Sequence, residues 1–252
     1  MGLLNSNNEK IQVLATLVRE FPNSTYIPDA LYELGNTYLA KNATEQAKVP
    51  YKRIIDQYPT SSVHRRALLQ VGLIYFNLNR NTEALDYYKK AVSQYPGTSE
   101  ARSALAGIRN IYVELNDVDA YLAYAKTLGD FANVTISEQD SLTYIAAENI
   151  YMSGNCQSAK EHFRRYIEQF PTGSFILNAH FYKADCHYKL NELHEALISF
   201  NFVIDRPKNM FTEQALLSAG EINFRLGNYA AALDNFNKLE IPDAGTHWPN
   251  EK

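Results

Sequence analysis

The sequence predicts an all-α protein, a solenoid of tandem helix–turn–helix repeats, on three observations. The first is a large aromatic residue followed by proline, which recurs at a regular interval along the chain. It stands at Phe21-Pro22, Tyr58-Pro59, Tyr95-Pro96 and Phe170-Pro171, so the first two intervals are equal and the last is about two periods. Phe131 keeps the aromatic residue midway through the long interval. A fixed period of this kind is the signature of a repeat architecture.

The second observation is an alanine followed four residues later by an aromatic residue, a pair that recurs with nearly the same period. An asparagine stands four or five residues before each alanine. After glycine, asparagine is the residue best able to take the left-handed conformation that ends a helix, so each one predicts a turn. The pairs are Ala47/Tyr51, Ala84/Tyr88, Ala120/Tyr124, Ala159/Phe163, Ala196/Phe200 and Ala232/Phe236, and the asparagines are Asn42, Asn79, Asn116, Asn155, Asn191 and Asn228.

The third observation is that apolar residues between the turns recur three and four positions apart, as at Leu31, Leu34 and Tyr38, which predicts amphipathic helices. Each repeat therefore has a first helix (helix A), an asparagine-containing turn, a second helix (helix B) and a proline break. Helices A are predicted at 28–40, 65–77, 100–114, 139–152, 175–189 and 212–225. Helices B are predicted at 45–57, 82–94, 117–130, 157–169, 193–204 and 229–239.

One proline falls inside a predicted helix. Pro50 lies well within helix B of the first repeat, where its missing N–H removes the hydrogen bond to the carbonyl of Gln46. The sequence therefore predicts a local kink or a delayed start of this helix.

Partial elements are predicted at both ends of the chain. Residues 1–27 are expected to be helix B of a preceding repeat without its helix A, and residues 242–252 a truncated C-terminal tail. Since solenoids need caps on their terminal faces, we expect a piece of a longer protein whose uncapped ends are able to self-associate. The six repeats between the ends are predicted at about 28–64, 65–99, 100–138, 139–174, 175–211 and 212–241.

These residues resemble the tetratricopeptide repeat, over about residues 9 to 239. Its signature is a large apolar residue, Leu-Gly, Tyr, then Ala, an aromatic residue, Ala and Pro at fixed spacing. The resemblance implies a right-handed α-solenoid whose concave face is formed by the helices A. The first repeat supplies Leu31, Leu34-Gly35, Tyr38, Ala47, Tyr51, Ile54 and Pro59, and the second Leu68, Val71-Gly72, Tyr75, Ala84, Tyr88, Ala91 and Pro96.

The register of helix A in repeats three to five has two solutions. A turn one residue shorter would put Tyr112, Tyr151 and Tyr188 where Tyr38 stands, and would put Arg109, Glu148 and Asp185 at the glycine position. Without that gap, Ala147 and Ala184 would take the glycine position in repeats four and five, and Lys183 would be buried. We favour the shorter turn.

Composition and charge exclude several classes of protein. Of the 252 residues, 46% are hydrophobic and 21% charged, as in globular proteins. The net charge of −4 argues against non-specific binding of nucleic acid, which needs a strongly basic surface. No apolar run is long enough for a transmembrane helix, and the N-terminus lacks the pattern of a signal peptide, so any signal sequence is expected outside this fragment.

No cofactor, metal site or enzymatic activity is predicted. The chain has no phosphate-binding loop, dinucleotide-binding fingerprint, zinc-protease helix or nucleophile elbow. His180 and His187 lie about 10 Å apart along one predicted helix, too far to share a zinc ion. The two cysteines, Cys156 and Cys186, are too few for a disulfide framework.

The resemblance implies that helix A residues beside the signature positions line the concave face and contact a partner. Three of them, Asn36, Asn110 and Asn149, fall at one repeat-equivalent position in the favoured register. A row of amides could hydrogen-bond an extended peptide backbone irrespective of its side chains. The full predicted set is Tyr32, Asn36, Arg66, Leu69, Leu73, Asn110, Asn149, Tyr182, Lys183 and Glu221.

The sequence therefore predicts a non-catalytic scaffold that binds a protein or peptide in the concave groove. The motif between the first two repeats, Tyr58-Pro59-Thr60-Ser61, is similar to that in the repeats of bacterial envelope proteins of outer-membrane assembly and of the Tol-Pal system. This resemblance implies a periplasmic location. The alternative is the sensory or regulatory repeat region of a longer signalling protein, such as a kinase.

Overall fold

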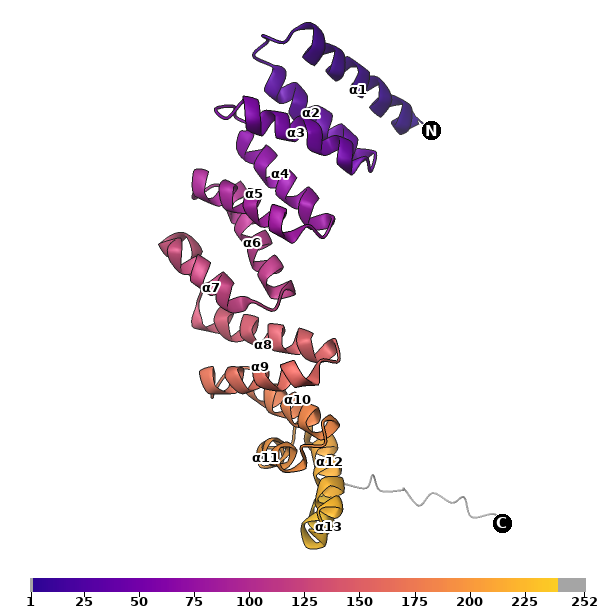
Figure 1. The fold of residues 1–252 in the computed structure, drawn as a ribbon, viewed down its shortest axis with the longest axis vertical. Helices are drawn as coiled ribbons and strands as arrows, with labels where there is room; N and C mark the ends of the chain where they lie inside the picture. The colour runs from indigo at the N-terminus through magenta and orange to yellow at the C-terminus, as the bar shows by residue number, and fades with distance from the viewer. Residues whose placement is uncertain (1, 240–252) are drawn as a thin grey trace, which may run out of the picture. The chain divides into compact units, whose positions relative to one another are not determined.

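The computed structural model describes residues 2–239, and within this range it contains thirteen α-helices, one short 3-10 helix and no strand (Figure 1). The predicted all-α fold of helix–turn–helix repeats is confirmed. The chain divides into two compact units, unit 1 up to Asn133 and unit 2 from Val134 onward. The predicted tail at 242–252 lies outside the described residues.

Unit 1 holds an unpaired first helix and three repeats. Consecutive helices pack on each other, and helix α4 also contacts α6, so these two successive helices A lie side by side. The helices are α1 (Gly2–Glu20), α2 (Ile27–Ala40), α3 (Thr44–Gln57), α4 (His64–Asn77), α5 (Asn81–Gln94), α6 (Ser99–Glu114), α7 (Val118–Thr127) and the 3-10 helix η1 (Gly129–Ala132).

Unit 2 holds the three later repeats, and here α8 contacts α10 in the same way. Its helices are α8 (Ile136–Met152), α9 (Cys156–Gln169), α10 (Ile176–Lys189), α11 (Leu193–Ile204), α12 (Thr212–Arg225) and α13 (Tyr229–Asn237). The predicted and observed helices A and B agree within three residues at every end. The third repeat's helix B differs most, because the α-helix stops at Thr127 and a 3-10 turn follows.

The predicted turn residues are confirmed in four repeats and shifted in two. Asn42, Asn79, Asn116 and Asn191 have φ between 55° and 61°, the left-handed conformation. In the fourth and sixth repeats the preceding glycine, Gly154 or Gly227, takes this conformation instead. Asn155 is then free to cap the next helix, and its side chain accepts a hydrogen bond from the N–H of Ser158 at 3.1 Å.

A backbone hydrogen bond that closes each A–B turn fixes the register of the repeats. The carbonyl of Tyr38 accepts it in the first repeat and that of Tyr112 in the third, so the shorter turn is confirmed there. In repeats four and five the acceptors are the carbonyls of Ile150 and His187. The prediction that Tyr151 and Tyr188 occupy the position of Tyr38 is therefore wrong by one residue.

The consequence is that alanine, and not a carboxylate, takes the glycine position in repeats four and five. Ala147 and Ala184 are both 0% exposed there, while Glu148 and Asp185 are half-buried beside them. The physical reason is close packing: a Cβ atom at Gly35 would lie 2.5 Å from the ring of Tyr51, so glycine or another very small residue is needed at this position in the first repeat. The third repeat differs, because the half-buried Arg109 takes the equivalent position there.

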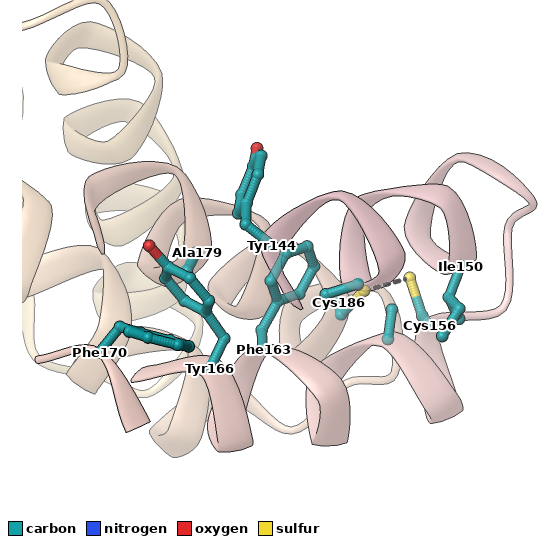
Figure 2. Packing of buried hydrophobic residues seen from close by; sticks show 10 residues of the cluster. Tyr144, Ile150, Cys156, Phe163, Tyr166, Phe170, Ala179 and Cys186 are labelled. Atoms are coloured by element: carbon teal, nitrogen blue, oxygen red, sulfur yellow. Dashed lines mark hydrogen bonds between the residues drawn. The ribbon is translucent and has the colours of Figure 1, made fainter. Parts of the chain in front are cut away.

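A cluster of aromatic and small side chains lies between α8, α9 and α10 in unit 2, and a second apolar cluster lies around α10, α11 and α12. Figure 2 shows Tyr144, Phe163, Tyr166 and Phe170 together with the two cysteines in the first cluster. Tyr144 stacks on Phe175 with 4.4 Å between ring centroids. Tyr144 and Tyr166 are thus core residues of unit 2.

Pro50 lies inside α3, which begins at Thr44 and continues to Gln57. The predicted delayed start of the helix is wrong, and the alternative, a local kink at Pro50, stays a prediction. The side chain of Pro50 is buried, so the helix accommodates the missing N–H and gains an apolar contact in exchange.

Candidate functional site

The exposed side of the helices A, on which the partner contacts are predicted, is called the A-helix face: α2, α4 and α6 in unit 1, and α8, α10 and α12 in unit 2. Two of the predicted residues in the first repeat already have structural partners. Tyr32 is only 5% exposed. The guanidinium of Arg66 lies over its ring, with the Cζ atom of Arg66 4.2 Å from the centroid of the Tyr32 ring. The side-chain oxygen of Asn36 accepts a hydrogen bond from the Tyr51 hydroxyl at 2.7 Å, and its nitrogen donates to Glu33.

The other predicted residues of unit 1 are more accessible. Arg66 and Asn110 are exposed, Leu73 is 41% exposed and Leu69 is half-buried. The amide of Asn110 makes no side-chain hydrogen bond to any of residues 2–239. Asn110 also stands two residues before the turn-closing carbonyl of its repeat, as Asn36 does, so their equivalence is confirmed.

In unit 2 the corrected register separates the predicted residues. The residue equivalent to Asn36 is Glu148, which accepts a hydrogen bond from Tyr144, and Asn149 is its neighbour. Asn149 is nevertheless exposed, and its amide forms no hydrogen bond within the part of the chain that the structure describes. Tyr182 is a packing residue, with its ring centroid 4.6 Å from that of Tyr151.

Lys183 does not belong to the A-helix face. It stands four residues before the turn-closing carbonyl, the position of Leu34, and its charged neighbours on α9 are Arg164, Glu161 and Glu168. Burial lowers the pKa of the Lys183 ammonium. The rejected alternative register, which buries Lys183, is therefore the correct one for this repeat.

Two equivalent groups of three side chains on the A-helix face of unit 2 were not predicted. The hydroxyl of Tyr151 donates to Asp185 at 2.7 Å, and Lys189 forms an ion pair with the same carboxylate at 2.6 Å. Burial, followed by the hydrogen bond to Asp185, raises the pKa of Tyr151 to about 12. The tyrosine therefore stays a hydrogen-bond donor at neutral pH.

The next repeat has the equivalent three residues in a related arrangement. Tyr188 is hydrogen-bonded to Glu221, which raises the pKa of the tyrosine. Arg225 lies over the Tyr188 ring and donates a hydrogen bond to the side-chain oxygen of Asn191 at 2.6 Å. Glu221, a predicted contact residue, is thus already paired. The sequence signal for these groups has three parts: a tyrosine at the end of one helix A, an acidic residue near the end of the next helix A, and a lysine or arginine one turn after that acidic residue. It becomes visible only in the correct register.

Unit 1 contains an open, mainly apolar pocket of about 480 Å³ between α1, α2 and α3. One repeat later, Tyr87 stands in place of Pro50 and Lys52 in place of Ala15. Tyr87 stacks on Tyr75 with 5.6 Å between ring centroids and so fills the equivalent space. The pocket thus arises from two small residues where the next repeat has large ones. It is lined by Ala15, Val18, Arg19, Leu31, Leu34, Tyr38, Gln46, Val49, Pro50 and Arg53.

The fifth repeat has polar residues at the same positions. His180 replaces Leu31, and its ring stacks on Phe202 with 3.6 Å between centroids. Burial, and then the charges of Lys183 and Arg206, lower the pKa of His180 to about 4. His180 is therefore neutral at pH 7, and its Nδ1 atom is buried without a partner among residues 2–239.

Because the folded pKa of His180 lies below the value of about 6.5 of an unfolded chain, the unfolded state binds more protons as the pH falls. Stability is fully present above pH 6.5 and decreases toward pH 4. We expect unit 2 to lose about 2 kcal/mol of unfolding free energy from this group between pH 7.5 and pH 5. Urea unfolding at both pH values should show that His180→Leu removes this loss, since leucine occupies the same position in the first two repeats.

The exposed His194 supplies the control, because His194→Leu changes the same residue type without removing a buried imidazole. An equal loss of stability on acidification in wild type and His180→Leu would contradict the assignment of this pH dependence to His180.

Neither a metal cluster nor a membrane-spanning element is found in residues 2–239. No group of three or more His, Cys, Asp or Glu side chains in this range could hold a metal ion. None of the helices in it combines the length and the hydropathy that crossing a membrane requires.

Sequence models of the tetratricopeptide repeat match residues 29–61 and 66–98 in unit 1 and residues 151–206 in unit 2. No curated protein sequence is significantly similar to the chain.

Among solved structures, a tetratricopeptide repeat protein from Parabacteroides merdae is 15% identical, with a TM-score of 0.44 over 97% of this chain and 93% of that one. PilF from Pseudomonas aeruginosa is 18% identical, with a TM-score of 0.38 over 87% of this chain and 93% of its own. YrrB, described as a TPR protein with an unusual peptide-binding site, is 16% identical, with a TM-score of 0.39 over 81% and 98%.

Proposed function

We propose that this chain, which carries tetratricopeptide repeats in both of its units, is a non-catalytic scaffold that binds a peptide or protein partner on the A-helix face. Such repeats are in general protein–protein interaction scaffolds. We place the contact on the A-helix face, because the helices A form the concave face in the family that the chain resembles. Each unit is taken as a separate contact surface.

The observation that carries the proposal is the state of two asparagine amides. Asn110 on α6 and Asn149 on α8 are exposed, and neither amide is hydrogen-bonded within residues 2–239. A primary amide offers one acceptor and two donor hydrogens, the pattern that an extended peptide backbone complements. Asn36, in contrast, is occupied by Tyr51 and Glu33, so we assign it a structural role.

The A-helix face of unit 2 supplies the rigid surroundings that such contacts need. The pairing of Tyr151 with Asp185 and Lys189 fixes these side chains before any partner arrives. A partner therefore meets a surface whose charged groups are already satisfied, and the exposed amide of Asn149 remains available. This favours recognition of a backbone over recognition of a charged terminus.

Substituting Asn110 and Asn149 by alanine is expected to weaken peptide binding without affecting stability. Each lost hydrogen bond is worth about 0.5 to 1.5 kcal/mol, so each single variant should lose about twofold to tenfold in affinity. The measurement is the Kd of peptides selected by the wild-type chain from a random peptide library, with the melting temperature as a check on folding.

Asn201→Ala is the matched control, because Asn201 is an exposed asparagine on α11, a helix B. Alanine substitutions of Lys89 and Lys90 on α5, which is also a helix B, would be poorer controls, because each ammonium group lies over a tyrosine ring and its removal would change a packing contact. If Asn201→Ala weakens binding while Asn110→Ala and Asn149→Ala bind as wild type does, the partner contacts the helices B and the proposal is wrong.

We also propose that this chain is part of a bacterial envelope protein, with its repeats in the periplasm. The support is the motif Tyr58-Pro59-Thr60-Ser61 between the first two repeats, which is similar to that in the repeats of bacterial envelope proteins. Fractionation of the source cells with an antibody against the chain tests it, and recovery in the cytosol would favour the alternative of a regulatory region in a signalling protein such as a kinase.

A further inference from the structure

The only two cysteines of the 252-residue sequence lie in contact in the core of unit 2. Cys156 is the first residue of α9, helix B of the fourth repeat, and Cys186 lies in α10, helix A of the fifth. Their Sγ atoms are 2.7 Å apart, and Figure 2 shows the two side chains pointing toward each other between the helices. Cys156 is 9% and Cys186 0% exposed.

This placement is not required by the repeat pattern. Both residues belong to the apolar cluster with Ile150, Ala159 and Phe163, where any small apolar side chain would fill the space. A thiol is a weak hydrogen-bond donor, so the contact of two reduced thiols adds little to packing. A covalent bond between the sulfur atoms needs them to approach by only roughly 0.7 Å more, to the disulfide length of about 2.05 Å.

We propose that Cys156 and Cys186 form an intrachain disulfide that joins the fourth repeat to the fifth. The oxidant is a low-molecular-weight disulfide such as oxidised glutathione. One cysteine thiolate attacks it, forms a mixed disulfide and releases the first glutathione thiolate. The second cysteine thiolate then attacks the protein sulfur of the mixed disulfide and releases the second. The two cysteines are oxidised, the glutathione disulfide is reduced to two thiols, and these take up the two cysteine protons.

The surroundings decide when this exchange is fast. Burial, reinforced by the neighbouring Cys156, raises the pKa of the Cys186 thiol, so its thiolate is scarce in the folded chain at neutral pH. The bond therefore forms most readily during folding, while the helices are still open. Cys156, at the start of its helix, is the more exposed of the two residues, so in the folded chain it is the one that an oxidant reaches more readily. Once formed, the bond is shielded from reductants by the same burial.

The disulfide would act on the A-helix face as well as on stability. Asp185, the acceptor of the Tyr151 hydroxyl, directly precedes Cys186 in α10. Linking α9 to α10 fixes the position of this carboxylate relative to α8. The bond also closes the segment between Cys156 and Cys186 into a loop, which restricts the unfolded chain.

The test is refolding of the whole chain from denaturant in a buffer of oxidised and reduced glutathione, followed by an acid quench and alkylation under denaturing conditions. We expect an intact mass reduced by two hydrogen atoms, no alkylated cysteine, and a cross-linked peptide containing Cys156 and Cys186. The melting temperature should be roughly 5 °C or more above that of the same protein refolded with a reductant.

The double variant Cys156→Ala with Cys186→Ala keeps the core filled with small apolar side chains and serves as the control. Its melting temperature should be the same in both buffers. If wild type refolds to a helical protein in the oxidising buffer with both cysteines alkylated, or if the control shows the same shift in melting temperature, the proposal is wrong.

Discussion

Replacing Gly72 with valine is expected to lower the free energy of unfolding of unit 1 by about 3 kcal/mol. The ring of Tyr88 lies between two glycines: a Cβ atom at Gly72 of α4 would be 2.5 Å from it, and so would one at Gly107 of α6. The tyrosine is 2% exposed, and the two glycines lie at opposite edges of its ring, so it has little room to move away. Overpacking at Gly72 must therefore push α4, α5 and α6 apart.

Urea unfolding followed by circular dichroism measures this loss. Valine has a higher helix propensity than glycine, so propensity cannot account for a loss of stability at Gly72. Ala40→Val introduces the same side chain at an exposed residue at the end of α2 and should change stability by less than about 1 kcal/mol. A Gly72→Val protein as stable as the Ala40→Val protein would show that Tyr88 is not clamped between the repeats.

Replacing Asp140 with alanine is expected to destabilise unit 2 by a similar amount, about 3 kcal/mol, for a different reason. Asp140 is 5% exposed, and its carboxylate accepts hydrogen bonds from the Tyr166 hydroxyl and from the N–H of Ser174, the latter at 2.7 Å. The Tyr166 hydroxyl oxygen in turn accepts from the N–H of Phe175 at 3.0 Å. Alanine would leave the two donors that point at Asp140 without an acceptor.

These bonds hold the proline break after α9 against α8, so hydrogen exchange of the Ser174 and Phe175 amides should report the loss locally. Asp205→Ala removes an exposed carboxylate in the same unit and should be close to neutral. If Asp140→Ala unfolds at the same urea concentration as Asp205→Ala, the network does not contribute to stability, and the position of the break is set by packing alone.

The helices and turns could be predicted from the sequence because they depend on residues close together in the chain. The prolines, the spacing of apolar residues and asparagines such as Asn42 and Asn79 placed all helices A and B within three residues. The glycines next to Asn155 and Asn228 were overlooked as turn residues, although glycine takes a positive φ at no steric cost.

The candidate site was only partly predictable, because it depends on register. A helix shifted by one residue rotates its side chains by about 100°. Tyrosine at position 151 or 188 fits the repeat signature better than isoleucine or histidine, which favoured the wrong solution. Asn110 was placed correctly by the shorter turn of its repeat, whereas Lys183 was assigned to the wrong face.

What the sequence by itself determined is thus the all-α repeat architecture, since a fixed period and turn chemistry act within one repeat. Tertiary structure alone decided which residues of different repeats meet: Tyr88 with Gly107, Tyr151 with Asp185, and Cys156 with Cys186. Each of these pairs joins helices of adjacent repeats. Their proximity follows from how the helices pack, because small residues such as Gly107 let a neighbouring helix and its large ring approach closely.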